Sequence, residues 1–202
     1  MYLRLINDTI QYPYNIVTLF NENKNTSFPR VPSDTLLATY NIYPVTEVQQ
    51  PEYNINTQKL IESDPIKIDN IWTQNWTIID LTEDEINNKI DDIINELAKI
   101  RYQHETGGVN VNGIIIDTSR QSQALINGAY STTLINPNTT INFKATSGWI
   151  NLNANDIINI ANVVSMHVQS CFNRELELYT LIKSSNNIND IINIDLNSGW
   201  PE

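Results

Sequence analysis

The chain has 202 residues, enough for one large domain or two small ones, and at 41% hydrophobic content it can bury a core. Its formal net charge of −11 excludes nucleic acid and anionic membranes as expected partners, because both bind clustered Lys and Arg side chains. The single cysteine, Cys171, cannot form an internal disulfide. The opening residues predict no signal peptide, and the interrupted apolar runs predict no membrane span.

Residues 1–48 are predicted to form a small β-rich N-terminal unit of mixed structure. Proline punctuates this segment, and the residue before a proline avoids the helical conformation, so only short elements are expected. Ser33 or Asp34 can cap a short helix. The expected elements are a strand at 2–5, a helix at 16–20, a helix at 35–40 and a strand at 42–45.

Residues 49–80 are predicted to be an extended connector that contains a hairpin. The pair Asp69–Asn70 tolerates the positive φ that a two-residue hairpin turn needs. Trp72 and Trp76 would lie on one face of an extended strand. Two indoles form a large apolar area, so we expect both to lie in a folded contact, on the N-terminal unit or on a partner chain.

The clearest helix is predicted for residues 81–105. Thr82 and Glu85 form a capping box at its start, and Gly107 ends it. Five apolar residues repeat at spacings of four and three, and their Ile-rich choice favours three or four associated helices over two. The same face could instead pack within its own domain, because the run is short for a coiled coil. This candidate oligomer interface comprises Ile86, Ile90, Ile93, Leu97 and Ile100.

Residues 106–184 are predicted to form a module of two hairpins and two helices that folds by itself. Asn112–Gly113 and Ser147–Gly148 are the expected hairpin turns. Thr118 and Gln121 form a predicted capping box at the start of the first helix. The fold class expected for the whole chain is therefore α+β.

A long second helix of this module is predicted to begin at Asn153, whose side chain can cap it, with Asp156 three residues later. In the first helix, Ala124, Leu125 and Ala129 are expected to face a core. The expected core of the module comprises Leu125, Phe143, Trp149, Val164, Val168 and Phe172.

The tail at 185–202 is polar with isolated apolar residues. Such a segment has too few apolar side chains to form a core alone. We therefore predict an arm that a partner orders.

The residue types that carry chemistry are sparse in this chain. His104 and His167 lack carboxylates or thiolates at ligand spacing, so structural roles are expected. Cys171 lies in an apolar helical pattern, which predicts a buried thiol and not a nucleophile. Neighbouring acidic residues on the helices do not face one another, so no acid/base pair is predicted. We expect no enzyme, no metal and no cofactor, with Arg120 and Arg174 forming salt bridges between helices.

The C-terminal half carries a specific combination of residues over about 80 positions. It resembles a domain of unknown function that is found in bacteriophage tail and tail-fibre-associated proteins. The matching positions are Gly107, Gly108, Asp117, Thr118, Ser119, Arg120, Ser122, Gln123, Trp149, His167, Val168, Gln169, Cys171, Phe172, Arg174 and Glu175.

The resemblance implies a structural component of a phage tail: a tail, baseplate or tail-fibre adaptor protein that acts through protein–protein assembly. Other tail proteins would be its partners, and its location would be the virion after synthesis in the host cytoplasm. Tail fibres are commonly three-fold, so the resemblance and the helical stripe together favour a homotrimer. The alternative is a tail-fibre assembly chaperone that the virion does not retain.

Overall fold

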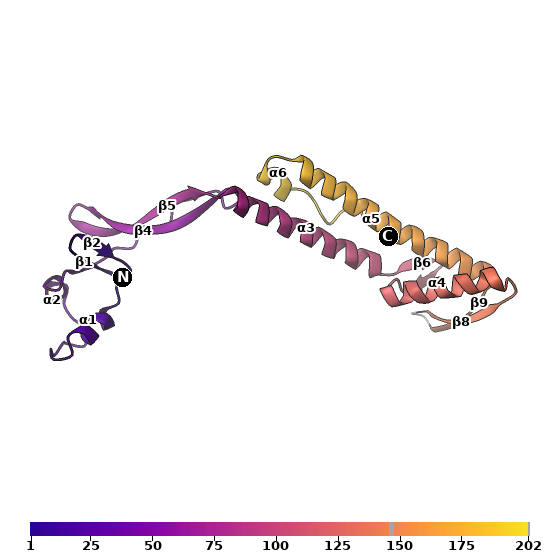
Figure 1. Ribbon diagram of the computed structural model, residues 1–202, viewed down its shortest axis with the longest axis horizontal. Coiled ribbons are helices and arrows are strands. Elements are labelled where there is room, and N and C mark those ends of the chain that lie inside the picture. The colour runs from indigo at the N-terminus through magenta and orange to yellow at the C-terminus, as the bar shows by residue number, and fades with distance from the viewer. Residues whose placement is uncertain (146–147, 202) are drawn as a thin grey trace. The chain divides into compact units, whose positions relative to one another are not determined.

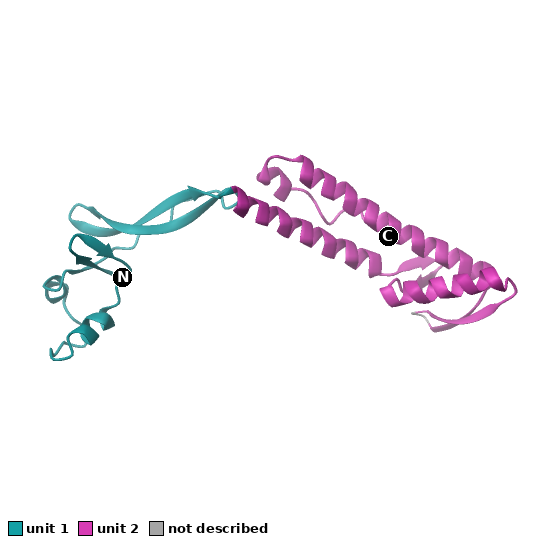
Figure 2. Ribbon diagram, viewed as in Figure 1, with its two compact units in different colours: residues 1–82 teal, residues 83–202 magenta. Residues whose placement is uncertain are grey.

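The structure, a computed structural model, describes residues 1–145 and 148–201 (Figure 1). The chain divides into two compact units, residues 1–82 and 83–202 (Figure 2). Both strands and helices contribute to each unit, so the predicted α+β class is confirmed. The three segments that the sequence separated after residue 81 form one compact unit.

A small antiparallel sheet organises the start of the first unit, with the strand order β2-β1-β3. The β1–β2 hairpin turns at Asn7 and Asp8, which have φ values of 48° and 64°. Asn and Asp are the non-glycine residues that best tolerate this left-handed conformation. The three strands are β1 (Tyr2–Ile6), β2 (Thr9–Gln11) and β3 (Ile42–Pro44).

Two short helices, α1 (Ile16–Glu22) and α2 (Asp34–Ala38), complete this part of the first unit. Ser33, one of the two predicted caps, begins α2 and accepts a hydrogen bond from the amide of Leu36. The helices and strands share one apolar cluster, and the rings of Phe20, Phe28 and Tyr40 pack at its edge. Its buried members are Tyr14, Leu19, Leu37 and Ile42.

The predicted hairpin is a long two-stranded ribbon of β4 (Gln58–Ile68) and β5 (Ile71–Asp80). Its turn is Asp69–Asn70, with φ values of 48° and 64°, as predicted. Trp72 and Trp76 are both half-buried within β5, so they lie in a folded contact. The edge of β5 pairs with Thr46, whose amide donates to the Trp72 carbonyl at 2.9 Å.

The second unit is built on two long antiparallel helices that lie side by side, α3 (Glu83–Thr106) and α5 (Ala154–Ser184) (Figure 1). The apolar face of α3 packs against α5 and against the segment after α5. That face contains the predicted oligomer stripe. Leu97 and Ile100 are buried there, while Ile90 and Ile93 are partly buried against the same cluster.

This packing answers a question that the sequence left open. The stripe at Ile86, Ile90, Ile93, Leu97 and Ile100 fits either self-association or packing within the domain, and four of the five residues have partners in their own chain. A second copy is therefore not needed to explain the stripe. The trimer itself stays a prediction, and the stripe no longer supplies a physical basis for it.

The predicted pair of hairpins and helices is confirmed. The first hairpin pairs β6 (Val109–Val111) with β7 (Ile114–Ile116) across Asn112 and Gly113, and α4 (Arg120–Ile135) follows it. The second hairpin pairs β8 (Thr140–Ala145) with β9 (Gly148–Asn153). Residue Ser147 of its predicted turn lies outside the described residues. Asn153 and Asp156 form the predicted capping box of α5.

The core of this module differs from the predicted one in several side chains. Leu125, Trp149 and Phe172 are 63%, 72% and 39% exposed, so they were wrongly placed in the core. Ala124 is also exposed, and Ile126 is instead the apolar residue of α4 that is buried. Phe143 and Val168 do pack on the cluster. Its buried members are Val109, Val111, Ile116, Ile126, Leu152, Ile157, Ile160 and Val164.

The two neighbouring residues of α4 give a direct test of this core. We expect Ile126→Ala to lower the free energy of unfolding by about 2–4 kcal/mol, because it opens a cavity in a packed cluster. Leu125→Ala, the matched control, should change it by less than about 1 kcal/mol, because Leu125 is exposed. Urea denaturation of both variants measures the difference, and a larger loss for Leu125→Ala would contradict this assignment.

The tail is folded onto its own chain, and the prediction that a partner orders it was wrong. Ile188 and Ile191 of the short helix α6 (Ile188–Ile192) are buried, and so is Trp200. Trp200 stacks on His104 of α3 with ring centroids 5.1 Å apart. Its indole N–H donates to the Leu196 carbonyl at 2.8 Å. The tail thus closes one side of the α3–α5 pair.

Candidate functional site

A buried carboxylate lies where the end of α3 meets the start of α4. The Glu105 side chain is fully buried and ion-paired with Arg101, one helical turn earlier, and with Arg120 of α4. The Arg120 guanidinium lies 3.0 Å from its Oε1, and the amide of Gln123 donates to the same atom at 3.2 Å. Buried charges are costly without such partners, so these contacts fix how α3 and α4 meet.

The loop before α4 is held by side-chain hydrogen bonds to the backbone. Thr118, which is buried, accepts from the Gly108 amide at 2.9 Å, and its carbonyl accepts from Gln123 at 2.8 Å. Gly108 has a φ of 94°, a conformation that disfavours any other residue. The predicted cap was wrong: Ser119, not Thr118, caps α4 by accepting from the Ser122 amide.

Asp117 braces the same turn. Its carboxylate accepts from the Ser122 hydroxyl at 2.6 Å and from the Ser119 amide at 2.9 Å. These hydrogen bonds, with that of Ser122 the largest cause, hold the pKa of Asp117 below its usual range. The charged carboxylate therefore stabilises the start of α4 at neutral pH, and this contribution is lost as pH falls through the depressed pKa.

The middle of α5 reaches the same place from the other side. Glu175 accepts from Nε of Arg101 at 3.1 Å, and the Arg101 guanidinium lies over the Phe172 ring, 4.6 Å from its centroid. We call this set the Glu105 junction: Arg101, Glu105, Arg120, Gln123 and Glu175. It holds two positive and two negative side chains, which balance one another.

His167 and Cys171 lie on the buried face of α5 beside this junction. His167 Nε2 is 3.0 Å from the carbonyl oxygen of His104, so Nε2 carries the proton and donates it. Within the described residues, Nδ1 of His167 has no hydrogen-bond partner. The His167 ring thereby ties α5 to the end of α3, which matches its predicted structural role.

The Cys171 thiol is shielded from reaction by the same packing. It is fully buried, and burial raises its pKa to about 11, with the nearby Glu105 charge adding to the rise. The thiol is therefore neutral at pH 7. Its burial favours folding below the pKa of the unfolded thiol, and this contribution is lost as pH rises through about 11.

We expect Cys171 to react with iodoacetamide on the order of a hundredfold more slowly in the native protein than in urea, because reaction requires opening of the α3–α5 interface. Mass spectrometry of the alkylated protein measures both rates. Met166→Cys in a Cys171→Ala background is the control, because Met166 is 70% exposed and should react similarly in both conditions. Equal rates for native and unfolded Cys171 would contradict the burial.

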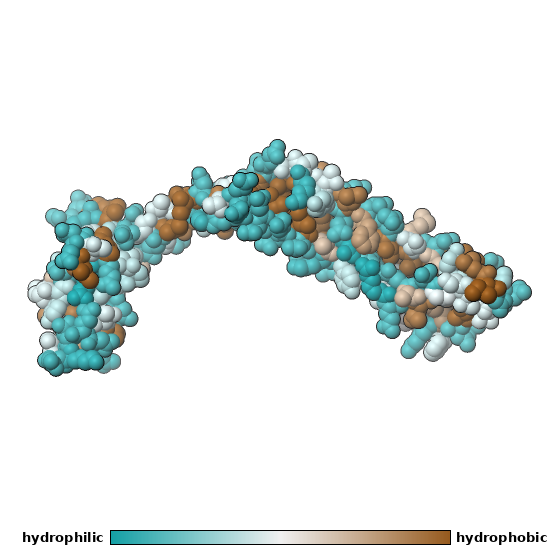
Figure 3. Space-filling model, viewed as in Figure 1, coloured by the Kyte–Doolittle hydropathy of each residue, from teal (hydrophilic) through white to brown (hydrophobic). Residues whose placement is uncertain are grey.

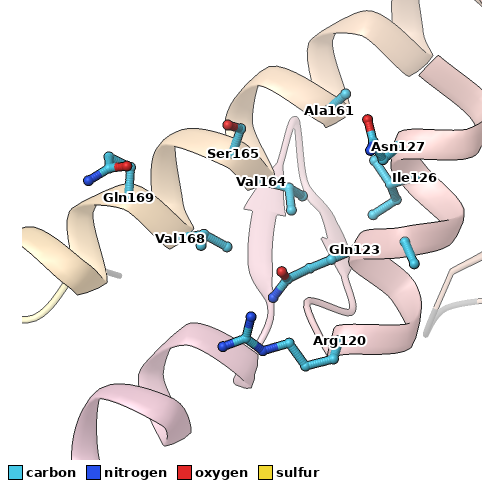
Figure 4. Close-up of a pocket in the computed structure, with 10 residues that line it drawn as sticks. Arg120, Gln123, Ile126, Asn127, Ala161, Val164, Ser165, Val168 and Gln169 are labelled. Atoms are coloured by element: carbon cyan, nitrogen blue, oxygen red, sulfur yellow. The ribbon is translucent and has the colours of Figure 1, made fainter. Parts of the chain in front are cut away.

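An open groove with a volume of about 510 Å³ runs between α4 and α5 (Figure 4). Arg120 and Gln123 line it from α4, and Val164, Val168 and Gln169 line it from α5. The two α4 side chains already bind Glu105, so this end of the groove belongs to the junction.

The described residues hold no group of three or more His, Cys, Asp or Glu side chains placed to bind a metal ion. In the same ranges, 1–145 and 148–201, no helix combines the length and apolar character that crossing a membrane requires.

The predicted salt bridges of the two arginines have different outcomes. Arg120 joins α4 to α3 through Glu105, as predicted. Arg174 instead pairs with Glu177 on its own helix and donates to the Ser198 carbonyl in the tail at 3.1 Å. It therefore fastens the tail to α5 and not one helix to another.

Sequence reasoning missed Glu105 and Arg101, although a signal was present. A carboxylate in the last turn of a helix faces the negative end of the helix dipole and is unfavourable without a cation. The i,i+4 spacing of Arg101 and Glu105 supplies one. The sequence could not reveal Arg120 and Glu175 as further partners, because they lie 15 and 70 residues further along the chain.

These features define a small α+β domain whose buried polar residues join three helices. One family model matches residues 89–196, that of the domain of unknown function DUF4376, and the chain belongs to this family. No curated protein and no solved structure matches the chain. The match begins within α3 and ends after α6, so four of the five stripe residues, all but Ile86, and most of the tail belong to the family's domain.

Proposed function

We propose that the protein is a structural component of a bacteriophage tail, as a tail, baseplate or tail-fibre adaptor protein. Its work is assembly with other tail proteins and with copies of itself. The observation that carries the proposal is the structural role of the polar residues at the positions that resemble the tail-protein pattern. They join α3, α4 and α5 through ion pairs and hydrogen bonds within the chain.

Two contacts illustrate this role. Arg120 binds the buried Glu105, and Thr118 accepts a hydrogen bond from the Gly108 amide. Each of these polar side chains is bound by another residue of the same chain. The neutral, buried Cys171 thiol is equally unsuited to nucleophilic chemistry. We therefore propose a non-enzymatic role in which the family domain is a scaffold.

The surfaces of the first unit supply a second line of support. The β4–β5 ribbon is only two strands wide, and several of its isoleucines are exposed. Exposed apolar patches on a soluble chain commonly mark contacts with other proteins. The partners proposed here are other tail proteins and further copies of this chain, for which the sequence predicts three-fold association.

The test is the composition of purified particles of the phage whose genome encodes the chain. Quantitative mass spectrometry should find the protein at a fixed ratio to the known tail proteins. Its presence in infected cells but absence from particles would overturn the structural role and favour the assembly chaperone. A gene that lies in no phage genome would overturn both.

A further inference from the structure

The β4–β5 ribbon has two faces of different character. Strand neighbours alternate between faces, so Glu62, Trp72 and Gln74 share one of them. Contacts confirm this sharing: Gln74 donates to Glu62 at 2.6 Å, and the hydroxyl of Tyr12 also donates to Glu62. This face, which also carries the two tryptophans, contacts Tyr12 and the backbone of Val48, whose amide donates to Gln74 at 3.2 Å.

The opposite face combines five exposed isoleucines with uncharged polar residues and one lysine. Its five isoleucines are between 39% and 57% exposed, and Figure 3 shows apolar side chains at the surface of the ribbon. Ser63 and Thr77 share this face, since their hydroxyl oxygens are 2.7 Å apart. We call it the isoleucine face. Its isoleucines are Ile61, Ile66, Ile68, Ile71 and Ile79.

The charge of this face is unusual for the chain. The chain carries 23 acidic residues and a net charge of −11, yet the strand-paired positions of the isoleucine face include no Asp or Glu. Two copies repel each other wherever acidic surfaces meet. The paired positions of this face add no such repulsion, so the face is matched to an apolar surface without acidic residues, such as its own copy.

The order of residues along the face is nearly symmetric, apart from a β-bulge that adds one residue to β4 between Ser63 and Ile66. The central pair, Ser63 and Asn75, has an Ile–Thr pair on either side, with the isoleucine on β4 in both cases. Each outermost pair contains an isoleucine of β5. From one end to the other, the paired rows are Lys59–Ile79, Ile61–Thr77, Ser63–Asn75, Ile66–Thr73 and Ile68–Ile71.

This symmetry makes the face complementary to itself. A two-fold axis across the strands at the central row would reverse the row order of a second copy and place β4 over β4. Ile61 of one copy would then meet Ile66 of the other, twice in the dimer, and Ile71 would meet Ile79. At the ends of β4, Ile68 would meet Lys59, whose aliphatic stem can pack on it while the ammonium stays in water. Polar residues would meet polar residues in the middle. Such a self-matching patch is what an isologous two-fold interface requires.

We propose that the isoleucine face of the β4–β5 ribbon joins two copies of this chain, face to face, about a two-fold axis at the row of Ser63 and Asn75. The proposal deepens the self-association of the proposed function and gives it two-fold symmetry in place of the three-fold symmetry expected from the sequence. It is independent of where the protein functions. The face that carries the contact is the one opposite to Trp72 and Trp76, which were the partner residues expected from the sequence.

The size of the ribbon sets the strength of this contact. Ten residues of strand span about 34 Å, and a ribbon is only two strands wide. The buried area is therefore at the small end of specific interfaces, and a micromolar dissociation constant is expected. The association should persist at high salt, because it does not depend on ion pairs.

Light scattering of the full chain over a concentration series tests the proposal. We expect a reversible shift from the 23.1 kDa monomer to a dimer. The double variant Ile61→Lys, Ile66→Lys places like charges opposite each other in the dimer and should raise the dissociation constant by at least about a hundredfold. Ile78→Lys is the matched control, because Ile78 is 39% exposed on the other face, and its dimer should remain.

Crosslinking tests the geometry separately. In a Cys171→Ala background, Ser63→Cys should give a covalent dimer with a short bismaleimide, because the two introduced thiols lie beside the axis. Ile78→Cys should not. A monomer at all concentrations, a trimer, equal loss of association in the Ile78→Lys control, or equal crosslinking of both cysteine variants would overturn the proposal. Circular dichroism of each variant verifies that the fold is kept.

Discussion

We expect Glu105→Ala to lower the free energy of unfolding of the second unit by about 3–5 kcal/mol, the usual cost of removing one partner from a buried ion pair. Its carboxylate is fully buried, and Arg101, whose side chain is 14% exposed, would lose one of its two charge partners and keep only Glu175. Far-ultraviolet circular dichroism during urea denaturation measures the change, since the long helices are in this unit.

Two further variants separate charge from packing at this site. Glu105→Gln keeps the shape and some hydrogen bonds, so its loss should be intermediate, about 1–3 kcal/mol. Glu177→Ala removes an ion pair whose acidic side chain is 65% exposed and should cost less than about 1 kcal/mol. A loss below about 1 kcal/mol for Glu105→Ala would show that the junction does not hold α3 and α4 together.

The second large effect is expected from Trp200→Ala, at about 3–5 kcal/mol. The indole is 9% exposed, it stacks on His104, and it belongs to the cluster that joins α3, α5 and α6. Its loss removes a large apolar area from the interface and frees the last residues of the tail. The same urea denaturation measures it.

Trp149→Ala is the matched control for this prediction. Trp149 is 72% exposed, so its replacement should cost less than about 1 kcal/mol. Removal of residues 185–202 should destabilise the unit at least as much as Trp200→Ala, because Ile188 and Ile191 are also buried. A truncated chain as stable as the intact one would mean that the tail does not pack on the helices in solution.

Local signals in the sequence were sufficient for turns and helix starts. The turns at Asp69–Asn70 and Asn112–Gly113 and the capping box at Asn153 form as predicted. Each depends on the backbone preference of two or three adjacent residues, which no distant contact needs to assist.

The side of an element that faces the core was less securely predicted. On β9, Ile150 and Leu152 alternate with asparagines, and Trp149 falls on the asparagine side, so strand periodicity could have predicted its exposure. On α4 the side that faces the core includes Ile126 and Thr133, and the polar threonine made this side hard to recognise as apolar from the sequence. The predicted core gave more weight to the size of the hydrophobic residues than to the helical period.

The sequence by itself determined the α+β class, the hairpins, the long helices and the apolar stripe of α3, because these follow from neighbouring residues and their periodicity. The tertiary structure decided what each surface meets. It placed the stripe against α5 and the tail, gathered Arg101, Glu105, Arg120 and Glu175 into one junction, and left the isoleucine face of the ribbon uncovered. An apolar face fits any apolar partner, and a charge fits any opposite charge, so only the packing of residues far apart in the chain selects among them.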